Sequence, residues 1–268
     1  MKNRLIYFLI VSLCFVGFTS CSDDEDTNIK FYASSEAVNT VSVTTIGTIT
    51  VEVRNIKGAF TVKSNNEALA TVSVNPSIAL GVADGYSILA ISGIKEGSTT
   101  ITVTDSENRS ATLNVEVVIQ TLSMLITKHE TLIEAVSPTT VDEAAVEKIK
   151  NEIIGKLPLV GGGFKLSYTS DYAGTLIYYP DTKKLTEKKE GTFKWDGDEA
   201  TGRMVLKLYY NDVEYMYKYG SNSDLSTRSS PPAQLYLTID FTDSYSQMTK
   251  PKITKAIGAI LVTDGKGF

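Results

Sequence analysis

The stretch "SGIKEGSTTITVTD", residues 92–105, decides the fold of the first half of the chain. Its second half alternates Ile101 and Val103 with threonines, so one face of an extended strand is apolar and the other is polar. Gly93 and Gly97 bracket a short polar segment, which is typical of a bend between two strands. We therefore expect two strands joined by a bend, each with one buried face.

Short runs with the same period of two recur on both sides of this stretch. They are Val41 and Val43; Ile49, Val51 and Val53; Phe60 and Val62; and Leu113, Val115 and Val117. Turn-forming residues separate the runs at "NIKG", "KSNNE" and "TDSEN". This spacing of short alternating strands and turns predicts an antiparallel β-sandwich over residues 29–119.

Three stretches of this segment resemble the bacterial Ig-like family, group 2. They are "SNNEALATVSV" (64–74), the opening stretch (92–105) and "ATLNVEV" (111–117), and in the family a turn, an "ATVS" strand, a glycine bend and a "GTTTITV" strand follow in this order. The resemblance covers about ninety residues, and "YASSEAVNTVSV" (32–43) is less regular than the family pattern. It implies an Ig-like sandwich that serves as a stalk, a spacer or a receptor-binding module, without catalytic residues.

The N-terminus has the order of a secretory signal. Lys2 and Arg4 precede an apolar run from Leu5 to Phe18, and the small residues Thr19 and Ser20 follow it. The run is about fourteen residues long, whereas crossing a bilayer takes about twenty helical residues. We expect residues 1–20 to be a cleaved signal peptide; an uncleaved anchor, or simply a hydrophobic N-terminus, is the alternative.

The end of this segment resembles a bacterial lipoprotein signal, which implies that Cys21 is lipidated and becomes the mature N-terminus. Phe18 stands where the family usually has leucine. The acidic block that follows resembles the signal that sends some Gram-negative lipoproteins to the outer face of the outer membrane; it consists of Ser22, Asp23, Asp24, Glu25 and Asp26. We expect residues 21–28 to be an acidic tether and the protein to be exposed on the cell surface. A plain solvated linker is the alternative.

Charge and cysteine content narrow the functional classes. The chain has 26 basic and 31 acidic residues, and cleavage before Cys21 would leave 248 residues with a net charge of −7. This balance excludes nucleic-acid binding, because no basic stripe is present to neutralise phosphates. Cys14 would leave with the signal and Cys21 would carry lipid, so no disulfide is expected. No cofactor is expected either.

Residues 120–268 have a different composition, with eleven of the fourteen tyrosines and the only tryptophan. A helix is predicted first, because Leu122, Leu125, Ile126, His129, Leu132, Ile133 and Val136 share one face at helical spacing. Pro138 would end it. Thr140 and Glu143 then form the pattern of a capping box, which predicts a second helix that ends near Gly155.

From Gly163 onward the apolar period changes to two. Turn residues at "YPDTKK", "WDGDEATG" and "YYND" separate the runs, which predicts a meander of antiparallel strands. The fold class is therefore mainly β, with a sandwich followed by an α+β domain whose N-terminal helices pack on an antiparallel sheet. A helix-capped β-barrel is the rival. The segment 220–233 is expected to be a long loop.

No catalytic constellation stands out, so we expect a protein that is not an enzyme. His129 is the only histidine and cannot build a zinc site with other imidazoles or a free thiol. A hydrolase that uses carboxylates such as Asp171, Glu190 or Asp240 is a third hypothesis, because paired acids about 5 to 9.5 Å apart can cleave glycosides.

The strongest candidate site is a face of the C-terminal strands that alternates charges with tyrosines, namely Lys207 and Tyr209; Glu214, Met216 and Lys218; and Tyr236, Thr238 and Asp240. Phe193 and Trp195 share a face of their own short strand. A tyrosine ring can stack on a sugar while its hydroxyl forms hydrogen bonds, which suits a glycan or a surface protein. We expect contacts from Tyr179, Trp195, Tyr209 and Tyr236. The plain alternative is that tyrosine favours strands and stabilises sheets. The alternative function is a structural or assembly subunit of a surface complex, which would form a stable oligomer where the binding module would be a monomer.

Overall fold

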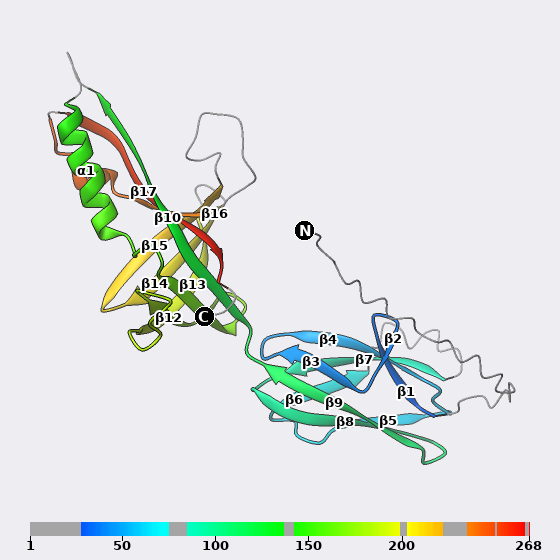
Figure 1. The fold of residues 1–268 in the computed structure, drawn as a ribbon. Coiled ribbons are helices and arrows are strands. Elements are labelled where there is room, and N and C mark those ends of the chain that lie inside the picture. The colour runs from blue at the N-terminus through cyan, green and yellow to red at the C-terminus, as the bar shows by residue number, and fades with distance from the viewer. Residues whose placement is uncertain are drawn as a thin grey trace, which may run out of the picture.

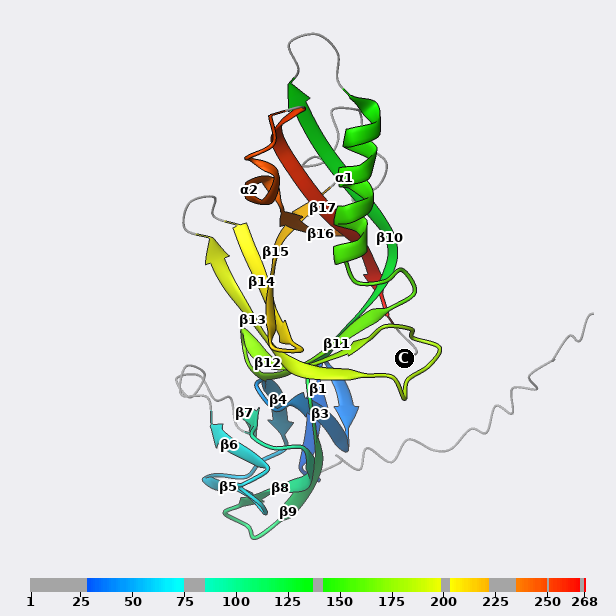
Figure 2. The ribbon, with the colours of Figure 1, turned by 90° about the vertical axis from the view of Figure 1, so that its left-hand side faces the viewer.

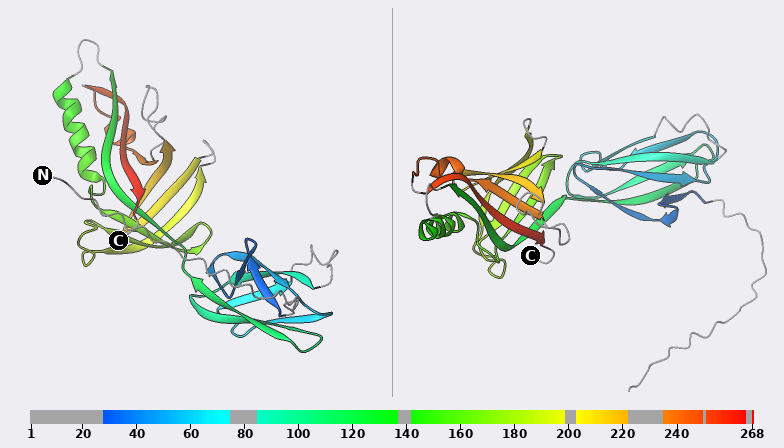
Figure 3. Two further views of the ribbon diagram at one scale, coloured as in Figure 1. Left: turned by 45° about the vertical axis from the view of Figure 1, so that its right-hand side comes forward. Right: turned by 90° about the horizontal axis from the view of Figure 1, so that it is seen from above.

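The computed structural model describes residues 28–74, 85–136, 142–198, 203–221, 235–249, 251–265 and 268. The lipidation site and export block predicted at residues 21–26 lie outside these ranges, as do Pro138 and Thr140. The described chain is mainly β and forms two bodies joined at residues 119–120, as Figures 1 and 3 show.

Two sheets form the first body. The five-stranded sheet has the order β2 (Glu36–Val38), β1 (Lys30–Ala33), β4 (Thr48–Arg54), β7 (Tyr86–Gly93) and β6 (Ala70–Val74). The four-stranded sheet has the order β3 (Thr40–Thr44), β9 (Ser110–Val118), β8 (Gly97–Asp105) and β5 (Phe60–Ser64). The strand pairs in these two sheets are antiparallel except β3–β9, which is parallel.

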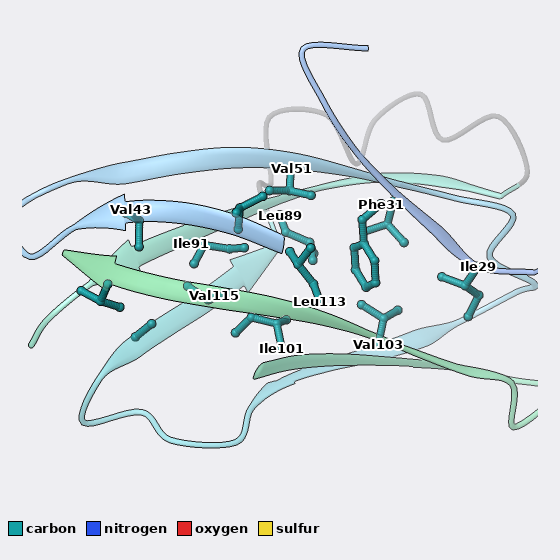
Figure 4. Packing of buried hydrophobic residues seen from close by; sticks show 14 of the residues in the cluster. Ile29, Phe31, Val43, Val51, Leu89, Ile91, Ile101, Val103, Leu113 and Val115 are labelled. Carbon is teal, nitrogen blue, oxygen red and sulfur yellow. The ribbon is translucent and has the colours of Figure 1, made fainter. Parts of the chain in front are cut away.

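The apolar faces of the two sheets meet in one core. Figure 4 shows Val51 and Leu89 from the five-stranded sheet facing Ile101 and Leu113 from the other, and all four are buried. The stretch quoted at the outset supplies the end of β7 and all of β8. Its alternation of buried and half-buried residues has the period of two that the sequence predicts, so period-two burial builds this body.

The second body is a closed eight-stranded barrel. Its strands are β10 (Thr121–Val136), β11 (Gly163–Ser170), β12 (Ala173–Tyr179), β13 (Lys189–Asp198), β14 (Arg203–Tyr210), β15 (Val213–Ser221), β16 (Leu235–Asp240) and β17 (Lys252–Asp264). Each pairs antiparallel with the next, and β10 pairs with β17 to close the ring. The prediction of an open sheet covered by helices is therefore wrong, and the strands form the barrel that was the alternative prediction.

The helix predicted over residues 122–136 is also wrong, because this segment is strand β10. A bulge between Ile126 and Lys128 shifts the register by one residue, so that Ile126 pairs with Val262 and His129 pairs with Ile260. Val262 and Ile260 both belong to the barrel core. A spacing of three therefore occurs within a strand and imitates the spacing of a helix. Pairing with β17 along almost the whole strand supplies the backbone hydrogen bonds that a helix would have supplied internally.

The second predicted helix is present as α1 (Glu143–Lys156), followed later by the short α2 (Thr242–Tyr245). The N-cap of α1 is Asp142, whose carboxylate accepts a hydrogen bond from the Ala145 amide at 3.1 Å. Ile149 and Ile153 bury the inner side of α1 against β17, beyond the barrel core. Leu157, directly after α1, enters the barrel core itself.

Candidate functional site

The barrel wall opens where β15 and β16 diverge. Their ladder runs only from Lys218 to Ser221 on β15, so its first residues, Val213 to Tyr217, lie outside it. Figure 2 shows β15 turning away from β16, with the C-terminal end of α1 on the other side of the opening. A cleft of about 1020 Å³, here called the barrel cleft, lies at this opening.

The lining of the barrel cleft combines apolar and charged side chains. The apolar members are Val205, Tyr215, Met216, Ile239 and Phe241, and the charged members are Lys156, Asp196, Lys207, Glu214, Lys218 and Asp240. Three cations face three carboxylates, so the cleft carries no net charge. A pocket with an apolar floor and a few convergent polar groups is the usual form of a small-ligand site.

Ion pairs fix part of the charged side of the cleft. The Asp196 carboxylate lies 2.6 Å from Lys194 Nζ and 2.8 Å from Lys207 Nζ. These hydrogen bonds, first from Lys194 and then from Lys207, lower the pKa of Asp196 below its usual value. The same contact raises the pKa of Lys207. Both groups therefore stay charged at neutral pH and present fixed hydrogen-bonding groups.

Lys156 stands at the mouth of the cleft without a carboxylate partner among the described residues. Its Nζ lies 5.5 Å from the ring centre of Phe241 and 5.3 Å from that of Tyr245. It donates a long hydrogen bond to the Tyr245 hydroxyl at 3.5 Å, and that hydroxyl donates to Glu152 at 3.3 Å. Aromatic rings therefore hold this cation, and its remaining N–H donors are available to a ligand.

The four predicted contact residues do not come together. Tyr209 is exposed on the outer face of β14, whereas Tyr236 is 4% exposed and packs against Ala259 and Leu261. Tyr179 is buried edge-to-face against Phe268, with ring centres 5.8 Å apart. Trp195 points inward and donates a hydrogen bond to the Tyr168 hydroxyl at 3.2 Å.

Trp195 lines a second groove of about 1020 Å³, together with Leu122, Tyr219, Leu235 and Val262. The sequence grouped Trp195 with Phe193 on one face, and both residues do face the barrel core. This inward orientation separates Trp195 from Tyr209. The predicted single tyrosine surface is therefore replaced by two aromatic-lined openings.

Sequence reasoning identified part of the barrel cleft and missed the rest. The strip that alternates charge with tyrosine supplied Lys207, Glu214, Lys218 and Asp240, which do line the cleft. It missed Lys156, Tyr215 and Phe241, because the first lies on a helix and the other two belong to the inward face. The inward tyrosines on β15 were visible as an alternating run, but nothing in that run shows that the barrel opens beside them.

The carboxylates of the hydrolase hypothesis lie apart. Asp171 lies in the turn between β11 and β12, and Glu190 pairs with Ile177 near the other end of β12, so about four residues or 13 Å of strand separate them. Glu190 and Asp240 lie on β13 and β16, three strand spacings or about 14 Å apart along the wall. Glu190 is paired with Lys188 at 2.7 Å, and Asp240 accepts from the Thr242 amide at 2.8 Å.

His129 is hydrogen-bonded at the boundary of the barrel core. Its Nε2 lies 2.6 Å from the carbonyl oxygen of Pro158. Within the described ranges, no group of three His, Cys, Asp or Glu side chains could hold a metal ion. No helix there is both long enough and apolar enough to cross a membrane.

Comparisons with known proteins give no family for this chain. No family model and no curated protein matches it. Among solved structures, domains 4 and 5 of the S-layer protein SbsC are 28% identical with a TM-score of 0.28, over 34% of this chain and 51% of that one. Domains 5–6 of SbsC are 16% identical with a TM-score of 0.29, over 78% and 89% of the two chains. At these TM-scores the likeness carries no conclusion about function.

Proposed function

We propose that this protein is a non-enzymatic binding lipoprotein of the cell surface and that the barrel cleft holds its ligand, a glycan. The observation that carries the proposal is the opening between β15 and β16, where aromatic rings and fixed charges converge. Tyr215 and Phe241 offer rings on which a sugar can stack. The balanced charges around them suit a neutral ligand that is rich in hydroxyl groups.

The location rests on the N-terminal sequence. The signal-like residues 1–20, Cys21 and the acidic block after it support a lipid-anchored protein of the outer membrane, exposed on the surface of a Gram-negative cell. In this arrangement the first body is a spacer and the barrel is the binding module. A carboxylate-dependent hydrolase is not part of the proposal, because Asp171 and Glu190 of that hypothesis do not line the barrel cleft.

A glycan array tests the binding site directly. Protein without residues 1–21 would be screened, and retained glycans titrated against two variants. Phe241→Ala removes a ring from the cleft and is expected to weaken binding at least tenfold, about 1.4 kcal/mol. Tyr209→Ala removes an exposed tyrosine outside the cleft and is expected to leave affinity unchanged. If Tyr209→Ala weakened binding and Phe241→Ala did not, the ligand would bind the outer face at Tyr209 and the barrel cleft would not be the binding site.

A structural subunit of a surface complex is the second candidate, and one observation favours it. Tyr209 and Met216 are 46% and 55% exposed, and the strand register places both on the outer face of the β14–β15 hairpin. Exposed apolar groups of this size gather at protein interfaces. Light scattering separates the two candidates, because an assembly subunit forms a stable oligomer without ligand and the binding module stays a monomer.

A further inference from the structure

A second opening lies at the end of the barrel next to the first body, where β10 begins and β17 ends (Figure 1). The groove of about 1020 Å³ that Trp195 lines at this end is here called the mouth groove. Among the described residues, it shares none of its lining with the barrel cleft. The mouth groove is therefore a separate place at which a molecule can be bound.

The floor of the mouth groove is apolar. Met124 and Val262 line it, and both belong to the barrel core. Leu122 and Leu235 continue this inward face to the rim, because they pair with Leu166 and Val262, which are core residues. Leu122 is 38% exposed, so solvent reaches the apolar surface. A concave apolar surface at the mouth of a barrel is typical of a ligand site.

Two aromatic residues form one wall of the groove. The rings of Trp195 and Tyr219 meet edge-to-face, with centres 6.0 Å apart and planes at 69°. The indole of Trp195 is held in place, because its Nε1 donates a hydrogen bond to the Tyr168 hydroxyl at 3.2 Å. Since this bond satisfies the only polar atom of the indole, Trp195 presents apolar surface to the groove. Tyr219 is 44% exposed and extends the wall toward solvent.

The charge of the groove lies on the other side of the rim. Lys165 is the one cation among the described residues of the lining, and it pairs with Ser123. The neighbouring pair of Met124 and Phe164 faces the barrel core, so alternation places Lys165 on the outer face. Lys165 forms no ion pair within the described ranges. The other charged residue of the lining, Asp264, already has an interaction partner.

This distribution selects the ligand. The lining hydroxyls of Thr121, Ser123 and Thr263 lie on the outer strand faces, away from the apolar floor. A glycan would therefore bury hydroxyl groups against the floor without hydrogen bonds, which is costly. An unbranched alkyl chain has no polar group to desolvate and gains from every methylene group that the floor covers. A carboxylate at its end complements Lys165 beyond the rim.

We propose that the mouth groove is a second ligand site, for a free long-chain fatty acid. The alkyl chain lies on Leu122, Trp195 and Tyr219, and the carboxylate pairs with Lys165. This site does not depend on the glycan proposed for the barrel cleft, because the two linings share none of the described residues.

The fluorescence of Trp195 tests the site directly, because this residue is the only tryptophan of the protein. Protein without residues 1–21 would be titrated with laurate below the critical micelle concentration. A saturable change in fluorescence is expected, and laurate should bind at least about tenfold more tightly than decanoate, since each covered methylene group contributes about fourfold. Dodecyltrimethylammonium, which has the same chain length and a positive head, should bind at least about tenfold more weakly than laurate.

Two pairs of variants assign the ends of the ligand. Lys165→Gln should abolish most of the preference for laurate over the cationic amphiphile, whereas Lys183→Gln, an exposed lysine outside the lining, should retain it. Leu122→Asp places a carboxylate on the apolar surface and should weaken laurate at least about tenfold. Ile119→Asp is its matched control, because Ile119 is 40% exposed and lies outside the lining. This control should leave the affinity for laurate unchanged.

Three results would overturn the proposal. The first is no saturable change of Trp195 fluorescence with laurate, and the second is a preference for laurate that survives Lys165→Gln. The third is binding to phosphatidylglycerol vesicles without binding of monomeric laurate, which would make the groove a membrane-docking surface. None of these results depends on whether a glycan binds the barrel cleft, so the two proposals fail separately.

Discussion

Asp105, the last residue of the stretch "SGIKEGSTTITVTD", joins two loops at one end of the sandwich. Its carboxylate, which is fully buried, accepts hydrogen bonds from the backbone amides of Lys57, Glu107 and Arg109 at 3.1, 3.0 and 3.1 Å. The Arg109 guanidinium adds a charged hydrogen bond from Nε at 3.0 Å. The buried Asp105 carboxylate, at the end of an otherwise apolar strand face, therefore accepts several hydrogen bonds.

The contribution of Asp105 to the stability of the fold should depend on pH. Burial alone would raise its pKa, but hydrogen bonds from Arg109 and from the amides outweigh burial and lower the pKa. A lowered folded pKa means that Asp105 stabilises the fold above its unfolded value of about 3.9 and ceases to do so as the pH falls through the folded value. We expect Asp105→Asn to melt about 5 °C lower at pH 7, and this gap to close below about pH 4.

Glu107→Gln is the control for this measurement, because the Glu107 side chain is 60% exposed and contacts the same arginine. Thermal melts of the three proteins at pH 7 and pH 3 suffice. A gap between wild type and Asp105→Asn that is as large at pH 3 as at pH 7 would contradict the assignment.

At single positions, the sequence predicts burial better than it predicts the site. Ile101 and Val103 are buried as the alternation requires, because burial follows from the period of the strand. Tyr215 could be assigned to the inward face in the same way. The exposure of Tyr215 to the cleft could not be predicted in this way. It depends on the position at which β15 diverges from β16, and no local sequence pattern indicates that position.

Gly258 is the position at which α1 meets strand β17. A Cβ atom there would lie 2.7 Å from Ile153 Cγ2 and 2.9 Å from Phe241 Cε2, both closer than real contacts allow. Gly258→Ala should therefore lower the free energy of unfolding by about 1–3 kcal/mol, as overpacked cores do. Gly155→Ala in α1 meets no atom within 4 Å and should raise it by about 0.5–1 kcal/mol.

Urea unfolding of both glycine variants checks this pair, because the same substitution is expected to act with opposite sign. If Gly258→Ala were as stable as wild type, α1 would not pack closely on β17. The cleft would then lose the wall that Lys156 provides.

Among the elements, short alternating strands were predictable and β10 was not. The spacing of Ile126 and His129 fits a helix as well as a bulged strand, and the local sequence does not choose between them. Pairing with β17, more than a hundred residues away, decides in favour of the strand. Helix α1 was predictable because its apolar stripe is a local feature, but its caps are Asp142 and Leu157 and not the predicted Thr140 and Gly155.

On the scale of the whole molecule, closure of the barrel creates the site. A meander could be inferred from the turns, but whether its first and last strands pair depends on distant residues. The structure shows that they do, which fixes β16 beside β17 and leaves β15 to diverge from β16. The barrel cleft is thus a consequence of topology and not of any one motif.

The proposed anchor is also a property of the whole chain. Cys21→Ser should move the protein from the detergent phase to the aqueous phase when cell extracts are partitioned in Triton X-114, because lipid is the only anchor proposed. Replacing Asp23, Asp24, Glu25 and Asp26 by alanine should keep the protein in the detergent phase but remove it from surface labelling of intact cells. Partitioning unchanged by Cys21→Ser would refute the lipid anchor.

Hydrogen–deuterium exchange with a retained glycan tests the central claim most directly. The backbone amides of Val213 to Tyr217 lie beside the cleft and outside the ladder with β16, so ligand in the cleft should slow their exchange. The opposite end of the sandwich, around Asp105, should be unchanged and serves as the internal reference. Slowed exchange around residues 213–217 and 239–241 is the predicted result. Protection confined to the outer face around Tyr209, with none at residues 213–217, would contradict the account.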